Sequence, residues 1–280
     1  MLKSEIQEIE KTDFDLDLLG FDNSFLNDLL SDDDLQQLEE DEVPEVQENT
    51  VSVLGDVWNL GNHVLHCNDS SIDLFNCNET SIVFTDPPYQ LDQDVIVDIL
   101  KGTNAKDFVL IATFKQLIDI CNNDFFKFHF DFVIDAKIPK SFMNKKQPYY
   151  THQNGVYLTT DGNTKFNCDN AKGIRSGVDT GYWHTIIESP RSTKNEHGHA
   201  KNAQGMIDVI CAFEFDELVD PFAGSGTSLI VAENLKKKWE GCEIDPKYCD
   251  VIIRRWQNLT GKEAVLKSNG KTFREVENAS

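Results

Sequence analysis

Four consecutive residues have the types that could bind a flat ring carrying an amino group. The apolar run at residues 81–85 is typical of a buried strand, and Asp86, Pro87, Pro88 and Tyr89 follow it directly. The prolines stiffen the backbone, so that a carboxylate, a rigid carbonyl and an aromatic face are presented together. The first two can accept hydrogen bonds from an amine, and the third can stack on a ring. An ordinary strand-ending turn has the same composition, and these residues alone leave both interpretations open.

A second group of residues, in the last third of the chain, could hold a nucleoside. The loop after the strand end at Asp220 contains Phe222, Gly224, Gly226 and Thr227. Glycines allow the backbone to approach a ligand closely, and Glu243, 17 positions after Gly226, could bind two ribose hydroxyls at the tip of the next strand. The loop has neither the third glycine of a dinucleotide fingerprint nor the Lys of a P-loop. A nicotinamide cofactor and a nucleotide triphosphate are therefore both disfavoured as ligands. By itself it is equally compatible with a structural turn.

Together, the sequences Asp-Pro-Pro-Tyr and Phe-Ala-Gly-Ser-Gly resemble the paired motifs of the amino-group DNA methyltransferases. Members of that family bind S-adenosylmethionine and methylate adenine at N6 or cytosine at N4. The order here, with the tetrapeptide first, a variable basic stretch next and the glycine loop last, resembles the permuted β class. The resemblance covers about residues 52–268 and implies a Rossmann-like class I methyltransferase fold, an α/β protein with a mostly parallel, doubly covered sheet and a target-recognition insert.

The resemblance also implies roles for individual residues. Asp86 and the Pro87 carbonyl would accept the N–H bonds of a flipped base, with Pro88 completing the rigid turn and Tyr89 stacking on the ring. The residues implied in S-adenosylmethionine binding are Asp69, Lys201, Asp220, Phe222, Gly224, Gly226, Thr227 and Glu243. Two departures stand out: Asn202 replaces a proline that often follows the lysine, and Gln153-Asn154-Gly155 stands where relatives commonly have His-Glu. No catalytic role is therefore expected of Gln153.

The net charge of −22 is distributed unevenly along the chain. Residues 1–50 hold 17 acidic residues and 2 Lys (net −15), so residues 51–280 hold 31 acidic and 24 basic residues (net −7). Between Lys137 and Lys201 there are 10 Lys or Arg against 5 Asp or Glu. A local basic face can bind phosphates whatever the total charge is. The candidate contacts to double-stranded DNA, in a target-recognition region expected at about 138–200, are Lys137, Lys140, Lys145, Lys146, Arg175, Arg191 and Lys194. For each of them a plain solvated charge is the alternative.

The elements expected to position these residues alternate between strands and helices, as in an α/β sheet. The expected strands lie at 57–67 (a hairpin), 81–85, 108–113, 130–135, 155–160, 218–220 and 239–245. The expected helices lie at 71–77, 95–100, 116–122, 228–238 and 246–258, and the three lysines 236–238 would form the last turn of the fourth.

Residues 1–49 are expected to form an acidic arm that precedes a methyltransferase domain at 50–280. Phe and Leu side chains between residues 14 and 30 would fit short amphipathic helices separated by charge runs. Such an arm could be solvated, or it could dock on a second copy of the chain or on another protein. Residues 18–22 loosely resemble the segment that precedes the methyltransferase in phage and prophage proteins with a ParB-like domain upstream.

Several classes of function are disfavoured. Seven cysteines, none spaced two or three residues apart, predict reduced thiols and no structural metal. No apolar run approaches membrane-spanning length and no signal-peptide pattern is present, so a cytoplasmic protein without membrane association is expected.

Two alternatives to adenine methylation stay open. Cytosine N4 is the first, although the Asp of the tetrapeptide favours adenine because many N4 enzymes carry Ser there. The second is a non-catalytic homologue that binds DNA or a partner, with the acidic arm acting as a DNA mimic. The recognition sequence, a companion restriction enzyme and the oligomeric state are not encoded in any pattern found here.

Overall fold

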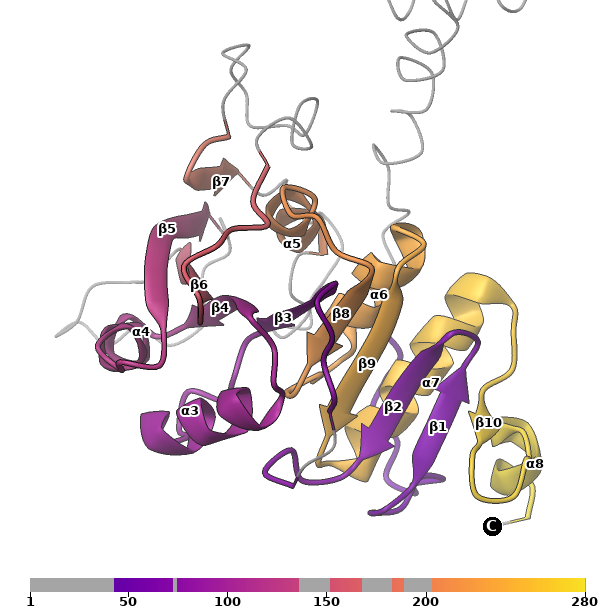
Figure 1. Cartoon of the computed structure of the whole chain (residues 1–280). Helices are drawn as coiled ribbons and strands as arrows, with labels where there is room; N and C mark the ends of the chain where they lie inside the picture. The colour runs from indigo at the N-terminus through magenta and orange to yellow at the C-terminus, as the bar shows by residue number, and fades with distance from the viewer. Residues whose placement is uncertain (1–42, 73–74, 136–151, 168–182, 189–202, 280) are drawn as a thin grey trace, which may run out of the picture. The chain divides into compact units, whose positions relative to one another are not determined.

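The computed structural model describes residues 43–72, 75–135, 152–167, 183–188 and 203–279, and every statement about structure refers to these residues (Figure 1). Their strands form one mixed sheet in the order β10-β1-β2-β9-β8-β3-β4-β6-β5-β7. The strands are β1 (Val57–Leu60), β2 (His63–Cys67), β3 (Ser81–Thr85), β4 (Asp107–Ala112), β5 (Lys127–Asp135), β6 (His152–Thr159), β7 (Ile186–Glu188), β8 (Glu217–Asp220), β9 (Lys238–Glu243) and β10 (Val265–Leu266). The helices are α3 (Gln93–Gly102), α4 (Phe114–Cys121), α5 (Ala203–Ile210), α6 (Thr227–Asn234), α7 (Pro246–Thr260) and α8 (Phe273–Glu277).

The five central strands, β2, β9, β8, β3 and β4, are parallel to one another. Their carboxyl ends therefore meet along one side of the sheet, which is called the carboxyl edge below. The chain passes from β2 across two strand positions to β3, moves outward to β4, and returns later to fill the gap with β8 and β9. In open α/β sheets, a crevice for ligands forms at the carboxyl edge where the direction of winding reverses. This topology confirms the predicted α/β class.

The helices cover the sheet because each has an apolar face. On α3 the buried side chains are Ile96, Val97, Ile99 and Leu100, and with α4 it joins a core that includes Phe108 and Leu110 of β4. In Figure 1, α6 and α7 lie behind β8 and β9. The turns that start these helices are specified locally: the side chain of Asp92 caps α3, and that of Asp245 caps α7, in which Pro246 takes the first position. No helix among the described residues is long and apolar enough to cross a lipid bilayer.

Aromatic side chains fasten the segments that flank the sheet's outer strands. Phe166 forms an isolated antiparallel bridge with Phe213, and the indole of Trp183 donates a 3.3 Å hydrogen bond to the carbonyl of Asp208. The ring-to-ring contacts join Phe130, Phe132, Tyr157, Phe166, Trp183 and Phe213. The described segments 161–167 and 183–188 are thereby packed onto the sheet within the expected recognition region.

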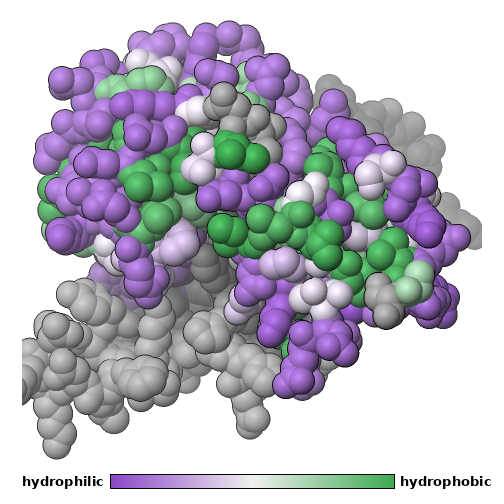
Figure 2. Space-filling model, turned by 90° about the horizontal axis from the view of Figure 1, so that it is seen from below, coloured by the Kyte–Doolittle hydropathy of each residue, from purple (hydrophilic) through white to green (hydrophobic). Residues whose placement is uncertain are grey.

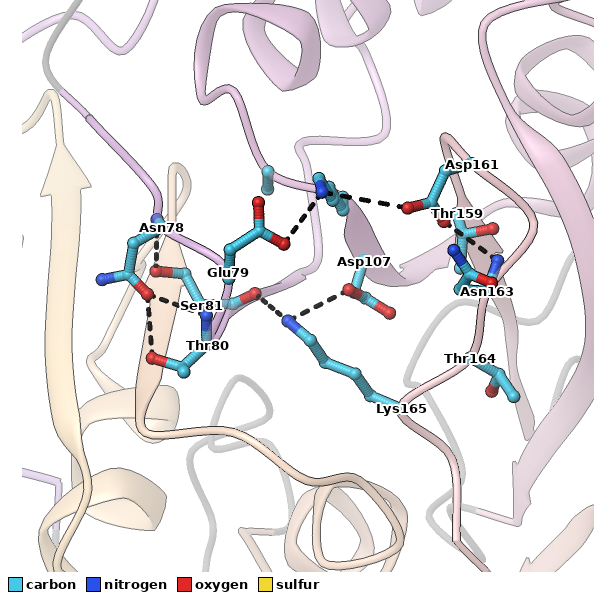
Figure 3. Close-up of polar contacts among 12 residues, drawn as sticks. Asn78, Glu79, Thr80, Ser81, Asp107, Thr159, Asp161, Asn163, Thr164 and Lys165 are labelled. Carbon is cyan, nitrogen blue, oxygen red and sulfur yellow. Dashed lines mark hydrogen bonds and ion pairs between the residues drawn. The ribbon is translucent and has the colours of Figure 1, made fainter.

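A buried ion pair fixes the chain after β6 at the edge opposite the carboxyl edge (Figure 3). The ammonium of Lys165 donates to the carbonyl of Ser81 at 2.9 Å and lies 3.1 Å from Oδ2 of Asp107. The hydroxyl of Tyr157 donates to Oδ1 of the same carboxylate at 2.6 Å. Burial and this hydrogen bond raise the pKa of Tyr157. Since both oxygens of Asp107 are used, the buried charge is compensated and the segment after β6 is held in one place.

One expected helix is absent from the described residues and another ends early, each for a local reason. Residues 71–72 and 75–77 are not helical, because the side chain of Asp69 accepts the N–H of Ser71 at 2.9 Å and offers the backbone an alternative to a helix. The helix expected at 228–238 ends at Asn234, and Lys238 already belongs to β9.

The early end of α6 has the hydrogen bonds of a Schellman motif. The N–H of Lys237 donates to the carbonyl of Ala232 at 2.9 Å, and that of Lys236 donates to Glu233 at 3.1 Å. Lys236 adopts a left-handed conformation with φ of 55°, although it is not glycine. The three lysines therefore do not form a last helical turn, as predicted, but lead into β9. The other expected strands and helices are confirmed, with ends that shift by a few residues.

Replacing Gly241 with Ala is expected to destabilise the protein by about 1 to 3 kcal/mol, the usual effect of overpacking. Gly241 lies in β9, and a Cβ there would collide with the buried indole of Trp239 two residues earlier. That indole cannot move freely, because its N–H donates to Oγ of Ser228 at 3.0 Å. Denaturant unfolding measures the effect, with Lys238→Ala, an exposed position on the same strand, as the control. Equal midpoints for Gly241→Ala and the wild type would contradict this packing.

Candidate active site

The two sequence motifs meet at the carboxyl edge, although 135 positions separate the residues that join them. β3 and β8 are neighbours, and each ends in one motif. The hydroxyl of Thr85, the last residue of β3, donates a 2.6 Å hydrogen bond to Oδ1 of Asp220, the last residue of β8. Both residues are buried. Asp86 and the glycine loop thus start from neighbouring strand ends. Two ligands bound by the two motifs would lie next to each other.

The tetrapeptide forms a supported turn that leaves its polar and aromatic groups accessible. Pro87 is buried, Asp86 is half-buried, and Pro88 and Tyr89 are exposed. The buried side chain of Gln116 supports this turn from α4. Its amide donates to the carbonyl of Pro88 at 3.2 Å and to that of Leu91 at 3.1 Å.

Gln116 is a site residue that the sequence interpretation missed. Its Oε1 accepts a 2.7 Å hydrogen bond from the hydroxyl of Thr113, and the two residues form the capping box that starts α4. The spacing Thr-x-x-Gln predicts such a box from the sequence. It does not predict that the same glutamine also holds the tetrapeptide.

Asp220 organises the start of the glycine loop. Besides Thr85, its carboxylate accepts the hydroxyl of Ser228 at 2.5 Å and the N–H of Phe222 at 3.1 Å. A carboxylate with three such donors is well compensated although it is only 4% exposed. The aspartate thereby fixes both ends of the loop, since Phe222 opens it and Ser228 lies in the first turn of α6.

The glycines of the loop are required by its backbone. Gly224 has φ of 56° and Gly226, which caps α6, has φ of 80°. Only glycine adopts these values without strain. A Cβ on Gly226 would also lie 3.0 Å from Cγ1 of Ile252, whereas nothing lies within 4 Å of a Cβ on Gly224. The loop is closely packed behind Gly226 and open above Gly224. A ligand would therefore have access to the backbone at Gly224.

A buried arginine of α7 holds the far side of the loop. Arg255 is 3% exposed, and its Nη1 donates to the carbonyl of Ser225 at 2.9 Å and to Oγ1 of Thr227 at 3.2 Å. The hydroxyl of Thr227 is therefore directed toward the protein interior, which fits the supporting role predicted for it. Arg255 itself was not predicted as a site residue, because thirty positions separate it from Ser225 and no local pattern links them.

The carboxylate of Glu243 lies against the open part of the loop. Its Oε2 accepts the N–H of Gly224 at 2.8 Å, and its Oε1 accepts the N–H of Asp245 at 2.9 Å. Burial raises the pKa of Glu243 above its ordinary value of 4.5, while these two N–H groups act in the opposite direction. Each carboxylate oxygen has a further lone pair, so Glu243 can accept more hydrogen bonds than the protein supplies.

Asp69 lies in the turn that follows β2, the strand next to β9. The N–H of the preceding residue, Asn68, donates to the carbonyl of Glu243 at 3.0 Å, so the two predicted acids come from adjoining strand ends. Asp69 itself is exposed, and one of its oxygens accepts the N–H of Ser71. The structure thus brings Asp69, Asp220 and Glu243 to the same edge as Asp86.

Apolar side chains also follow the strand ends at this edge. Phe114, directly after the cap of α4, is 66% exposed and Tyr89 is 46% exposed, while Ile72 and Ile244 follow β2 and β9. Figure 2 looks at the molecule from below, the side toward which β2 and β9 run in Figure 1, and shows a band of apolar surface between polar residues. Exposed aromatic rings beside a carboxylate fit a face that receives a planar, partly polar ligand.

Eight predicted residues lie outside the described part of the chain. They are Lys201 and the seven candidate DNA contacts, Lys137, Lys140, Lys145, Lys146, Arg175, Arg191 and Lys194. The described residues that flank 136–151 can be placed, however. β5 ends and β6 begins at the carboxyl edge, because Asn154 of β6 pairs with Ala112 at the end of β4 and Asp135 pairs with His152.

Comparisons with known proteins match two stretches of the chain. Residues 105–254, more than half of the chain, match the family model described as DNA methylase, and residues 1–54 match one described as ParB-methyltransferase HTH domain. The first match includes the glycine loop and Glu243. The second falls on the arm for which a similar resemblance was noted.

Individual relatives extend the comparison. The chain is 30% identical over 141 residues to the type II methyltransferase M.BamHI of Bacillus amyloliquefaciens, a match that covers 49% of this chain and 31% of M.BamHI. The matched part thus spans about a third of that relative's length.

Among solved structures, the PvuII DNA methyltransferase (cytosine-N4-specific) aligns with a TM-score of 0.58 at 17% identity, over 84% of this chain and 94% of its own. The M1.HpyAVI–SAM complex aligns with a TM-score of 0.53 at 16% identity, over 68% of this chain and 98% of its own. These two alignments show a shared fold, the class I methyltransferase fold that the motifs predicted.

Proposed function

The chain belongs to the DNA methylase family, and we propose that it transfers a methyl group from S-adenosylmethionine to the exocyclic N6 of an adenine in double-stranded DNA. The observation that carries the proposal is the hydrogen bond from Thr85 to Asp220. It couples the strand that ends in Asp86, an acceptor for an amine, to the strand that ends in the glycine loop. A methyl acceptor and a methyl donor held at these two places would be neighbours.

The residues at the glycine loop fit S-adenosylmethionine. The accessible backbone at Gly224 would accommodate the methionine portion, and the spare lone pairs of Glu243 would accept the ribose hydroxyls. Asp69, from the adjoining strand end, would lie toward the adenine, with Asp220, Phe222, Gly226 and Thr227 maintaining the loop. Lys201 is proposed as a further contact on the basis of the family resemblance. When bound, S-adenosylmethionine supplies a methyl group made electrophilic by its sulfonium.

The tetrapeptide supplies what an amino group needs in order to react. The lone pair of an exocyclic amine is delocalised into the ring, and in a duplex the amine is also paired, so the base must first be flipped out at a cost of a few kcal/mol. Asp86 and the Pro87 carbonyl accept the two N–H bonds and favour a tetrahedral nitrogen, while Tyr89 stacks on the ring. Asp86 is also the acceptor for the proton that the amine loses. Most of the catalysis is alignment, which is worth roughly 7 to 11 kcal/mol in well-oriented systems.

Adenine is proposed over cytosine because the tetrapeptide begins with Asp rather than Ser. Methylation of cytosine N4 would use the same acceptors and is the alternative. The seven basic candidates between Lys137 and Lys194 are proposed to contact DNA phosphates, which position the enzyme, whereas a few contacts to base edges would specify the sequence. The N-terminal arm is proposed to contact a second copy or a protein partner.

Transfer of tritium from methyl-labelled S-adenosylmethionine tests the proposed reaction. Purified protein is incubated with unmethylated double-stranded DNA, and parallel reactions contain RNA or an unrelated protein in its place. Acid-precipitable label is expected in DNA alone. If the protein binds the cofactor but labels none of these acceptors, the catalytic proposal is wrong and the non-catalytic alternative is favoured.

Cofactor affinity is expected to fall as the pH falls toward and below the raised pKa of Glu243. The carboxylate accepts ribose hydroxyls in its ionised form, and burial makes it protonate at a pH above its ordinary value of 4.5. Glu243→Gln should weaken binding about tenfold or more at neutral pH, because hydrogen bonds to a charged acceptor are the stronger ones. It should also remove the acid-dependent loss. Calorimetric titration with S-adenosylmethionine between pH 5 and 8 measures both effects, and the exposed Glu263→Gln is the control.

A further inference from the structure

The side chain of Gln153, for which no catalytic role is expected from the sequence, lies beside Asp86. Its Nε2 donates to Oδ2 of Asp86 at 3.4 Å. This distance is longer than the usual 2.7 to 3.2 Å, so the hydrogen bond is weak and its loss costs little. The donor assignment has a chemical basis, because an ionised carboxylate only accepts and the amide must turn its N–H toward it. The pair therefore offers one acceptor and one donor, side by side, at the carboxyl edge.

The backbone that carries Gln153 is fixed on both sides. Gln153 is the second residue of β6 and pairs with Ile134 of β5, while the next residue, Asn154, pairs with Ala112 of β4. Two residues on, Gly155 is buried under the ring of Phe132, which leaves no room for a Cβ. A side chain on such a strand is positioned more firmly than one on a loop. Only the amide head of Gln153 is then free to exchange one partner for another.

The flipped base presents the complement of this pair. In adenine the N6 amine, a donor, is adjacent to ring nitrogen N1, an acceptor, and in cytosine the N4 amine is adjacent to N3 in the same way. Asp86 can accept from the amine, but the ring nitrogen loses its Watson–Crick donor when the base leaves the duplex. A buried acceptor without a donor costs free energy, so a donor beside Asp86 would improve binding of the base.

We propose that Gln153 donates its Nε2–H to the ring nitrogen adjacent to the methylated amine, so that Asp86 and Gln153 together read the Watson–Crick edge of the flipped base. The inference rests on the proposed function, since it concerns the same site. Gln153 is then a specificity-determining residue: a base with an N–H at that ring position, such as guanine or thymine, meets a second donor and is rejected. The alternative is that Gln153 only holds Asp86 in place.

A chemical double-mutant cycle separates these two roles. After the methylated position has been mapped, a duplex with one target is made with adenine or with 1-deazaadenine, in which C–H replaces N1. If the methylated base is cytosine, 3-deazacytosine is used. The value of kcat/KM is measured for the wild type, Gln153→Ala and Gln153→Met, which has a similar size but no N–H to donate. Asn154→Ala is the control, because its side chain leaves the opposite face of the strand.

The wild type is expected to lose about tenfold in kcat/KM when N1 is replaced, the usual value of one hydrogen bond. On adenine, each Gln153 variant is expected to have a kcat/KM about tenfold below that of the wild type. Changing the substrate to 1-deazaadenine should not lower the kcat/KM of these variants any further. Independent, multiplying losses would overturn the proposal, since Gln153 would then act through Asp86 or the fold alone. Thermal midpoints of the variants check that they fold. Failure of the proposed function has a different signature, namely a wild type that methylates neither base.

Discussion

Replacing Asp86 with Ala is expected to abolish methyl transfer while leaving the binding of S-adenosylmethionine nearly unchanged. In the proposed mechanism the carboxylate accepts a hydrogen bond from the amine and then its proton, and the loss of a general base usually lowers the rate by about 10² to 10⁴-fold. At the proposed cofactor site, Asp220 and Glu243 hold the glycine loop through hydrogen bonds that do not involve Asp86. Single-turnover transfer of tritium to DNA measures the first effect, and calorimetric titration of the cofactor measures the second.

The matched control is Asp98→Ala, which removes an exposed carboxylate from α3, the helix that follows the tetrapeptide. Its transfer rate should equal that of the wild type. Turnover within a few-fold of the wild type in Asp86→Ala would remove this residue from the mechanism. Loss of cofactor binding in the same variant would show instead that the substitution disturbs the glycine loop through the neighbouring contact between Thr85 and Asp220.

Replacing Asp220 with Ala is expected to destabilise the protein by about 3 to 5 kcal/mol, because three buried donors lose their acceptor and each such loss costs about 1 to 3 kcal/mol. Three groups would lose their acceptor: the hydroxyls of Thr85 and Ser228 and the N–H of Phe222. All three lie at the junction of β3, β8 and α6, and the methyl group of alanine offers them no acceptor. Any protein that remains folded should bind S-adenosylmethionine weakly, because the loop then loses the carboxylate that fixes both of its ends.

Denaturant unfolding followed by tryptophan fluorescence suits this measurement, since the indole of Trp239 donates to Ser228 and reports on the same network. The control, Asp216→Ala, removes an exposed aspartate just before β8 whose partner is Lys237 at 3.5 Å. A surface ion pair of this kind contributes about 0 to 1 kcal/mol. An Asp220→Ala variant no less stable than this control would contradict the central role given to the aspartate.

The parts of the fold that could be predicted from the sequence are those with local causes. The apolar run before Asp86 and the glycines at 224 and 226 each carry their structural reason within a few residues, and both were predicted correctly. The order of the strands could not be derived from such patterns, because β8 and β9 insert between β2 and β3 from the far end of the chain. The family resemblance, which rests on two short motifs, predicted a mostly parallel sheet and a permuted order of the motifs, but not this order of strands.

The residues that were missed act through contacts between distant segments. Gln116 and Arg255 support the two motifs from helices. The capping box of Gln116 is visible in the sequence, but it does not reveal the contact with the tetrapeptide, and no local pattern marks Arg255. Gln153 was set aside because its segment departs from the pattern of the family, yet its amide lies next to Asp86. Lys236 was predicted as helical from its place in a run of lysines, whereas a Schellman motif places it in a left-handed conformation.

The most direct test of the account is nucleoside mass spectrometry of unmethylated genomic DNA after incubation with the protein and S-adenosylmethionine. In the proposed mechanism the two acceptors at Asp86 and Pro87 hold an amine, so the methyl group should be found on an exocyclic nitrogen. N6-methyladenine is the predicted product, and N4-methylcytosine would keep the mechanism while changing the base. Methylation of a ring carbon, as in 5-methylcytosine, would contradict the role assigned to the tetrapeptide. DNA that stays unmodified while the cofactor binds would contradict it too.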